Sequence, residues 1–559
     1  MKISTILGFS KQGAHTSAHV THYKTIAYSE HGKARHVIYK ENKHPGREGE
    51  HASELEACFT AVANALFAPH RALRQDIVTG QNGDVVGVTS EHAAHALLRI
   101  KHKQPEVVFL HTTAQFPSAD KVTSADFQVW LDGHKKIPGN GRKWEHLRAV
   151  WPFVQEYTER LNDYENERER IGEPRSEQSV AEWAHLRAQC IEHELLNAQQ
   201  EMDISALGAG KGFNFLDKLP QNFFAKLLEA QQAGHVDIDM DSLADVLTTA
   251  YALEEDDLHK GNIGYYVTEE QGRPCFHFFK IDHDLMLSDK VMAARDARLA
   301  NLAYTYTEFR ITARDLRGFP DLIDSGNHYW PTKHALLAKG DKAYQSEEDR
   351  NAYKSLKNNE QFVQAKWQRF LKQVVVPNSF IVRCLKQPLE RTDVDLEMAS
   401  TLAVVQRATA SRMSELRIAL VEVPEFRKYL AEHFDEAQKS IISEISQHAA
   451  SIGCSEQEIT QFAFAVKEAI KSMVVASELS TSQTALHTAV HTQSYRSYET
   501  AKLFKDSLNN VDKDGLTALD HAISQFEIAS SVLNNISVEV LPQKSHLLLK
   551  KCDVKVHLS

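Results

Sequence analysis

Residues 253–287 read LEEDDLHKGNIGYYVTEEQGRPCFHFFKIDHDLML, and this stretch decides how the rest of the chain is interpreted. Asp257 and Asn262 are five residues apart in a loop that contains Gly261, and Asp282 follows twenty residues later, after an aromatic run typical of a strand. Phosphoryl transfer needs a carboxylate that orients and deprotonates the attacking hydroxyl, and Mg²⁺ held by a few oxygen ligands. Asp257 is therefore the candidate base, and Asn262 and Asp282 are the candidate metal ligands. The competing interpretation is a turn between a helix and a strand, in which Asp and Asn serve turn geometry.

The spacing Asp257-x-His259-x-x-Asn262, followed by Asp282, resembles the catalytic and metal-binding loops of the protein-kinase-like superfamily. A histidine two residues after the aspartate is more similar to the phosphoinositide kinases than to ordinary protein kinases, in which the histidine precedes the aspartate. The resemblance implies a two-lobed, kinase-like α+β fold with ATP and Mg²⁺ or Mn²⁺ as cofactors. It also implies that His259 shares in proton transfer or steadies the γ-phosphate.

A lysine near the N-terminus extends this resemblance. His36–Lys40 resembles the kinase strand whose lysine contacts the α and β phosphates of ATP, so Lys40 is the candidate nucleotide ligand. A helix predicted over Glu50–Phe67 would supply its acidic partner, and of Glu54 and Glu56 we favour Glu54. The competing interpretation of Lys40 is a strand lysine that faces solvent.

Two turns are predicted in the same region. The segment from Gly8 to Gly13 joins two predicted strands and could cover ATP phosphates with backbone N–H groups, although a plain hairpin fits equally well. Asp76–Ser90 has Gln81-Asn82-Gly83-Asp84 at its centre, which predicts a β-hairpin.

The sequence departs from the kinase pattern at two places. The usual Asp-Phe-Gly is Asp282-His283-Asp284, and Glu254-Glu255-Asp256 takes the place of His-Arg-Asp. Asp256 competes with Asp257 for the role of base, and the spacing to Asn262 favours Asp257. These changes favour a divergent lipid-kinase-like or atypical kinase, and they leave a catalytically inactive one open.

Basic residues follow the predicted metal-binding segment. A phosphorylated inositol headgroup needs such cations, because arginine binds phosphate through a bidentate fork. Solvated surface side chains are the competing interpretation. The candidate headgroup ligands are Lys290, Arg295, Arg298, Arg310 and Arg314.

Composition restricts the class of protein. The chain has 559 residues, enough for two to four domains at about 150 residues each. Its 64 basic and 75 acidic residues give a net charge of −11, which argues against a nucleic-acid-binding chain. The six cysteines form no Cys-x-x-Cys pair, so no zinc site or disulfide framework is predicted. No run approaches the length of a membrane-spanning helix, and we expect a soluble cytosolic protein whose membrane contact is peripheral.

The predicted organisation has four regions. They are a small lobe over 1–110, a large lobe over 111–420 with a helical insertion over 150–205, a helical connector over 421–480, and ankyrin repeats with a tail over 481–559. The last region rests on an internal repeat, because Thr484-Ala-Leu-His-Thr-Ala-Val recurs 33 residues later as Thr517-Ala-Leu-Asp-His-Ala-Ile. This period and motif are those of ankyrin repeats, which would bind a protein partner.

A kinase-like domain joined to terminal ankyrin repeats resembles the ankyrin-bearing effectors that intracellular bacteria such as Legionella deliver into host cells. Some of these are phosphoinositide 3-kinase-like. The resemblance implies a virulence-related kinase that phosphorylates a phosphoinositide at a membrane surface of the host cell. The alternatives are an atypical Ser/Thr protein kinase whose ankyrin repeats dock a host protein, and an inactive scaffold with a kinase fold.

Overall fold

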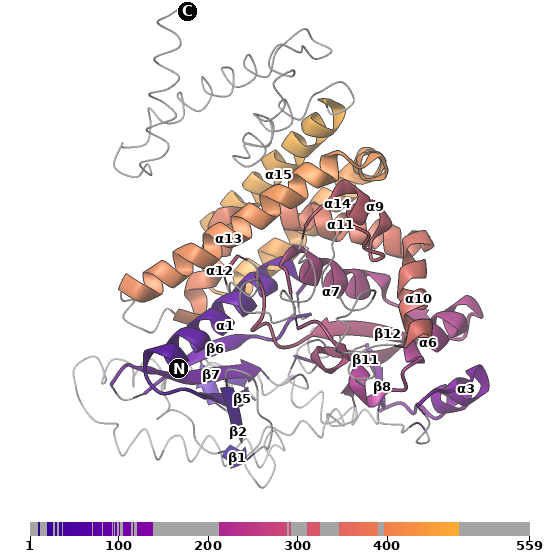
Figure 1. Ribbon diagram of the computed structural model, residues 1–559, viewed down its shortest axis with the longest axis horizontal. Helices are drawn as coiled ribbons and strands as arrows, with labels where there is room; N and C mark the ends of the chain where they lie inside the picture. The colour runs from indigo at the N-terminus through magenta and orange to yellow at the C-terminus, as the bar shows by residue number, and fades with distance from the viewer. Residues whose placement is uncertain are drawn as a thin grey trace, which may run out of the picture. The chain divides into compact units, whose positions relative to one another are not determined.

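The computed structural model has a mixed α+β fold (Figure 1). It describes residues 9–11, 19–25, 28–30, 33–35, 37–69, 71–80, 82–91, 93, 96–97, 100, 104, 106–112, 116, 120–137, 181, 212–255, 257–287, 290–291, 310–324, 332, 346–389 and 396–479. The insertion predicted over 150–205, apart from one residue, and the ankyrin repeats predicted over 481–559 therefore lie outside the described residues.

The N-terminal part is a five-stranded antiparallel sheet with the order β1-β2-β5-β7-β6. Most side chains of β6 and β7 are buried, and only Asp76, Val86 and Ser90 on these two strands are partly buried. The hairpin predicted over Asp76–Ser90 is confirmed as β6 and β7. The strand bounds are β1 Phe9–Lys11, β2 His19–Thr25, β5 Val37–Asn42, β6 Gln75–Thr79 and β7 Val85–Glu91, and β3 (Tyr28–Glu30) pairs separately with β4 (Lys33–Arg35).

Strands β5 and β7 approach each other very closely at Gly87. A β-carbon at this position would lie 2.2 Å from the carbonyl oxygen of Lys40 and 3.1 Å from the Cα of Glu41. The absence of a side chain at Gly87 thus lets the strand that carries Lys40 pair with β7 in its observed register.

Helix α1 (Arg47–Leu66) covers this sheet, and it confirms the helix predicted over Glu50–Phe67. It packs against β6 and β7 on one side and against α12 (Asn378–Lys386) and α13 (Leu396–Val421) on the other (Figure 1). Because α1 is covered on both sides, acidic side chains on it are buried as well as apolar ones, including Glu54 and Glu56.

A second sheet has the order β10-β12-β11-β8, and β9 also pairs with β11. Helix α7 (Met240–Ala252) packs on β12 and then leads the chain into the loop before β11. The aromatic run predicted to be a strand is confirmed as β12. The bounds are β8 Val108–Leu110, β9 Phe213–Phe215, β10 Asp237–Ile238, β11 Ile263–Glu270 and β12 Arg273–Lys280.

Helices make up most of the rest of the described chain. Apolar spacing in the sequence predicts helices over 241–253, 366–375, 396–420, 425–450 and 455–476, the last with a Ser455–Glu458 cap. Helices α7, α13, α14 and α15 match these bounds to within three residues and the cap is present, whereas α11 begins six residues before its predicted start. The bounds are α3 Ser124–Asp132, α6 Phe223–Gln232, α9 Ala313–Gly318, α10 Glu347–Ser355, α11 Glu360–Val375, α14 Pro424–Ser451 and α15 Glu456–Leu479, with short 3₁₀ turns at Leu216–Lys218, Lys260–Asn262, Leu356–Asn358 and Gln387–Leu389.

By its internal contacts the chain divides into two units, Met1–Ile470 and Lys471–Ser559. Among the helices of the described residues, none combines the length and apolar character required to cross a bilayer.

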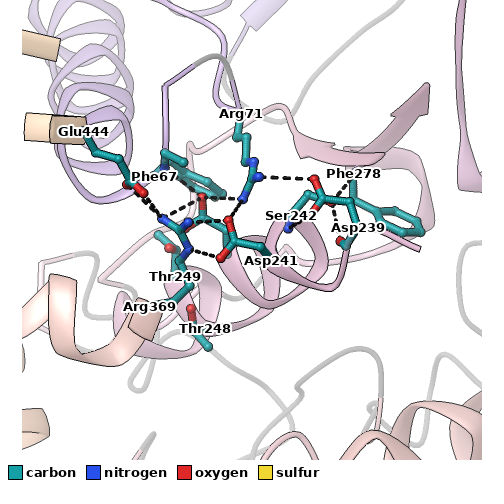
Figure 2. Close-up of polar contacts among 12 residues, drawn as sticks. Phe67, Arg71, Asp239, Asp241, Ser242, Thr248, Thr249, Phe278, Arg369 and Glu444 are labelled. Carbon is teal, nitrogen blue, oxygen red and sulfur yellow. Dashed lines mark hydrogen bonds and ion pairs between the residues drawn. The ribbon is translucent and has the colours of Figure 1, made fainter. Parts of the chain in front are cut away.

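A cluster of buried charges, here called the Arg369 cluster, ties the end of α1 to the helices (Figure 2). Arg369 on α11 donates to both carboxylate oxygens of Asp241 on α7 and lies 2.8 Å from Glu444 on α14. Only 3% of the Arg369 side chain is exposed, so the charge is compensated almost wholly by protein carboxylates. The cluster consists of Arg71, Asp239, Asp241, Asp245, Arg369, Lys372 and Glu444.

The Arg369 cluster holds the C-terminal end of α1 directly. Lys372 donates to the carbonyl of Phe67 at 2.8 Å, and the backbone N–H of Ala68 donates to Asp245 at 2.7 Å. Arg71, three residues further on, donates to Asp241 at 2.9 Å. These bonds satisfy backbone groups that the helix end would otherwise leave unpaired.

Candidate functional site

Lys40 is the centre of the candidate site. It lies on β5, and its Nζ is 2.9 Å from Glu56 Oε1 on α1 and 3.2 Å from Asp282 Oδ1, which follows β12. Burial lowers the pKa of Lys40, but the carboxylates of Glu56, Asp282 and Asp284 outweigh that effect, and the net pKa is raised. One buried, permanently charged amine thus joins the first sheet, α1 and a segment 242 residues away. Lys40 does not face solvent, which excludes the competing interpretation.

The acidic partner of Lys40 is Glu56, and our preference for Glu54 was wrong. Glu54 instead accepts a hydrogen bond from Arg47 at 3.0 Å, near the start of the same helix. Glu56 Oε1 also accepts from Gln75 on β6 at 2.8 Å, and this second bond fixes the carboxylate toward the sheet. Two positions on α1 that differ by two residues point to opposite sides of the helix, and both sides are covered.

The predicted base and metal ligand in the loop before β11 are in contact. Asn262 Nδ2 donates to Asp257 Oδ2 at 3.1 Å and to the Asp257 carbonyl at 3.0 Å. His259 Nδ1 accepts from the N–H of Gly261 at 2.9 Å, which leaves its Nε2 to face Asp257 Oδ1 at 3.5 Å. Burial raises the pKa of Asp257, but His259 and Asn262 outweigh it, so the pKa is lowered and the carboxylate is ionised at neutral pH.

The loop is anchored at both ends by buried cations. Arg412 on α13 donates to the carbonyls of Tyr251 and Ala252 and lies 3.1 Å from Glu254, so it closes the C-terminal end of α7, where a positive charge is favoured. Further along, Lys260 lies 3.2 Å from Asp349 on α10. A loop held at both ends presents its side chains in a fixed geometry.

The loop and Asp282 lie next to each other. The N–H of Ile281 donates to the carbonyl of Asn262 at 3.0 Å, and Ile263 faces Lys280 in the β11–β12 ladder. Asp282 itself has a φ of +59°, in the left-handed region that few non-glycine residues adopt. Such strain persists where the surroundings determine the conformation, and it is typical of functional sites.

Lys280 helps to hold the backbone of Asp282 in this conformation, and no motif in the sequence indicated this role. Its buried Nζ donates to the carbonyls of Ile281 and Asp282 and lies 3.1 Å from Glu255 Oε2. The two side chains are 1% and 0% exposed, so each is the main compensation for the other's charge. Lys280 is therefore a positioning residue, because its hydrogen bonds hold the backbone at Asp282.

We expect Lys280→Met to weaken divalent-cation binding about tenfold and to destabilise the protein by about 3–5 kcal/mol, because Glu255 is left as an unpaired buried charge. The double variant Lys280→Met/Glu255→Gln removes both charges and should recover most of the stability. It should not recover cation binding, since the Asp282 backbone still lacks its support. Urea denaturation and calorimetric titration with Mn²⁺ measure the two quantities. Recovery of both in the double variant would mean that Lys280 is merely structural.

His283 occupies the position that is phenylalanine in the family the sequence resembles. It is buried and its ring packs against Phe67 with 5.9 Å between ring centroids, so it fills an apolar position despite its polarity. Burial, assisted by the charge of Lys280, lowers the pKa of His283 to about 4. The ring is therefore neutral at physiological pH.

The donor set around Lys40 fits a divalent cation. Burial and the neighbouring charges of Asp282 and Glu56 raise the pKa of Asp284 to about 8, and burial likewise raises the pKa of Asp282. Carboxylates that share a buried site repel one another, and a bound cation would reduce that repulsion. Oxygen donors from Asn262 and Asp282 suit Mg²⁺ or Mn²⁺.

Two of the three predicted headgroup cations that the structure describes, Lys290 and Arg314, are paired with acidic side chains. Lys290 Nζ lies 2.7 Å from Glu415 on α13, and Arg314 lies 3.3 Å from Asp324. The Arg310 carbonyl accepts from Tyr251 at 3.0 Å. The predicted ligands Gly8, Gly13, Arg295 and Arg298, and the competing base Asp256, are outside the described residues.

No protein-family model and no curated protein matches the chain.

Proposed function

We propose that the chain is an ATP- and Mg²⁺-dependent phosphotransferase with a two-lobed, kinase-like fold. The observation that carries this proposal is the bridge from Lys40 to both Glu56 and Asp282, beside the Asp257–Asn262 pair. A strand lysine paired with a helix glutamate, together with an aspartate and an asparagine on neighbouring loops, is the set of groups by which kinases position nucleotide and metal. The five-stranded sheet with α1 corresponds to the small lobe, and α7 with the β11–β12 hairpin corresponds to the core of the large one.

Each residue has a distinct role in this proposal. Lys40, held by Glu56, would bind the α and β phosphates of ATP. Asp282 and Asn262 would hold magnesium, which when bound neutralises charge on the phosphates. Asp257 is ionised and oriented by Asn262, so it is suited to accept the proton of the attacking hydroxyl, and His259 is placed to assist it. General base catalysis contributes about 10²–10⁴-fold, so positioning and charge neutralisation would supply the rest of the rate.

The substrate we propose is the hydroxyl of a phosphoinositide headgroup at a membrane surface. The support for this class is the order of Asp257 and His259 in the loop, which is similar to that of phosphoinositide kinases. Against it, Lys290 and Arg314 are already paired with Glu415 and Asp324, which weakens the headgroup assignment and favours a protein hydroxyl as the second candidate.

The test incubates the purified full chain with γ-labelled ATP and Mg²⁺ or Mn²⁺, together with phosphoinositide vesicles or a protein lysate. Label in lipid supports the first candidate, and label in protein supports the second. Asp257→Asn removes the base but keeps the hydrogen bond to Asn262, and it should lower the labelling rate about 10²–10⁴-fold while ATP binding is retained. A chain that neither labels any substrate nor binds ATP would be an inactive scaffold, and the proposal would be wrong.

A further inference from the structure

A second group of ligand-type side chains lies at the far end of the β11–β12 hairpin, away from Lys40. One ligand atom each from Glu270, Cys275 and His277 lies within 4.8 Å of the other two. Cys275 and His277 alternate along β12 and so face the same side of the sheet, and Glu270 comes from the opposite strand β11. The three residues match no common metal-binding motif in the sequence, because Glu270 is on a different strand from Cys275 and His277.

The carboxylate of Asp239 orients the imidazole ring of His277. His277 Nδ1 is 2.9 Å from Asp239 Oδ2, and its Nε2 is 3.1 Å from Glu270 Oε1. The ring stacks on Tyr266 with 4.7 Å between centroids and 9° between planes. A carboxylate on one imidazole nitrogen, with the other nitrogen directed at further ligands, is the arrangement that supports metal-binding histidines.

Asp239 is itself fixed. It accepts from the N–H of Ser242 at the start of α7 and lies 3.2 Å from Arg71 in the Arg369 cluster. The orientation of His277 is thus determined by α7, and the carboxylate cannot swing away without breaking the helix cap.

We propose that Glu270, Cys275 and His277 form a zinc site, with a water molecule as the fourth ligand. One sulfur, one nitrogen and one oxygen donor suit zinc, whereas magnesium and calcium prefer oxygen donors alone. Ligands at about 2.0–2.3 Å from zinc are about 3.3–3.8 Å apart in a tetrahedron, so the three side chains need only small adjustments. Thr268, opposite Cys275, lies 2.8 Å from His277 Nε2 and would give up that contact when the metal enters.

The proposed site would join the end of the hairpin to the start of α7. Binding requires the Cys275 thiol and the His277 ring to lose their protons, since the thiolate and the neutral imidazole are the ligand forms. The proposed zinc site shares no residue with the Lys40 site, so zinc binding there does not depend on kinase activity.

The test is titration of the full chain with Co²⁺ and Zn²⁺. Co²⁺ bound at this site should show a thiolate-to-cobalt charge-transfer band that is displaced by Zn²⁺, and Cys275→Ser should abolish the band. Glu270 is exposed, so Glu270→Gln should leave folding intact and weaken Zn²⁺ binding by about tenfold or more. Cys454→Ser is the matched control, because this cysteine lies after α14, and it should behave as the unaltered chain.

Two outcomes would overturn the proposal. The first is the absence of a thiolate band in the unaltered chain at saturating Co²⁺. The second is a Zn²⁺ affinity that Glu270→Gln and Cys275→Ser both leave unchanged, which would assign binding to other side chains.

Discussion

Replacing Asp282 by Asn is expected to lower the rate of the ATP-dependent phosphotransfer that we propose about 10³-fold. The substitution removes the charged oxygen that would hold magnesium, and a metal acting on a phosphoryl oxygen contributes several kcal/mol, with each 1.36 kcal/mol worth about tenfold. Asparagine tolerates the left-handed backbone at this position and can still contact Lys40. Initial rates at saturating ATP and Mg²⁺, compared with the unaltered chain, measure the effect.

The same variant should fold at least as stably as the unaltered chain. Burial raises the pKa of Asp282 despite the charge of Lys40, so its ionised form is costly in the folded state. Asp435→Asn, at an exposed position of α14, is the matched control and should alter neither quantity. A stable Asp282→Asn protein with near-normal activity would remove Asp282 from the metal site.

Arg369→Met is expected to lower the free energy of unfolding by about 3–5 kcal/mol. The variant removes the buried guanidinium that Asp241 and Glu444 contact in addition to Arg71 and Lys372, and breaking one side of a buried ion pair costs about this much. Chemical denaturation at neutral pH measures the change. Lys428→Met, whose partner Glu432 is 3.8 Å away on an exposed helix face, should change stability by less than about 1 kcal/mol.

Acid titration gives an independent check on the Arg369 cluster. Burial works to raise the pKa of Glu444, but Lys372 and Arg369 outweigh it and lower the pKa from 4.5 to about 2. A lowered folded pKa stabilises the protein above the unfolded value, and this contribution is lost as the pH falls from about 4.5 toward 2. In Arg369→Met the loss should be smaller. An unchanged acid profile would mean that Lys372 alone holds Glu444.

Local structure followed from the sequence where a single periodic pattern covered a whole element. The helices α1, α7, α13 and α14 and the β6–β7 hairpin were predicted with nearly their observed bounds, whereas the start of α11 was placed six residues too late. Apolar spacing and turn residues are local signals, so no knowledge of tertiary packing was needed.

The partner of Lys40 could not be assigned in this way. Glu54 and Glu56 lie on a helix whose two sides are both covered, and a hydrophobic stripe identifies one buried side only. The hydrogen bond from Gln75 to Glu56 depends on how β6 lies against α1, which is a tertiary fact.

The buried cations were also beyond sequence analysis. Lys280, Arg369 and Arg412 are each 3% exposed or less, although lysine and arginine are rarely buried without a partner. Their carboxylate partners Glu255, Asp241 and Glu254 are 25, 128 and 158 residues away in the chain, so no spacing rule could identify these pairs. That Lys40 and Asp282 share one site was expected only because a resemblance to a known family linked distant motifs; their direct ion pair was not predicted.

The close approach at Gly87 has a consequence for variation in this protein. Any side chain there would push β7 away from the carbonyl of Lys40, and the lysine would be displaced from Glu56 and Asp282 without any change to the site itself. Were the codons of β7 randomised and active clones recovered, Gly87 should return as an invariant position, whereas the partly buried Val86 beside it should accept many residues. Such a selection for activity would then identify Gly87 as essential, although this residue does not contact the substrate.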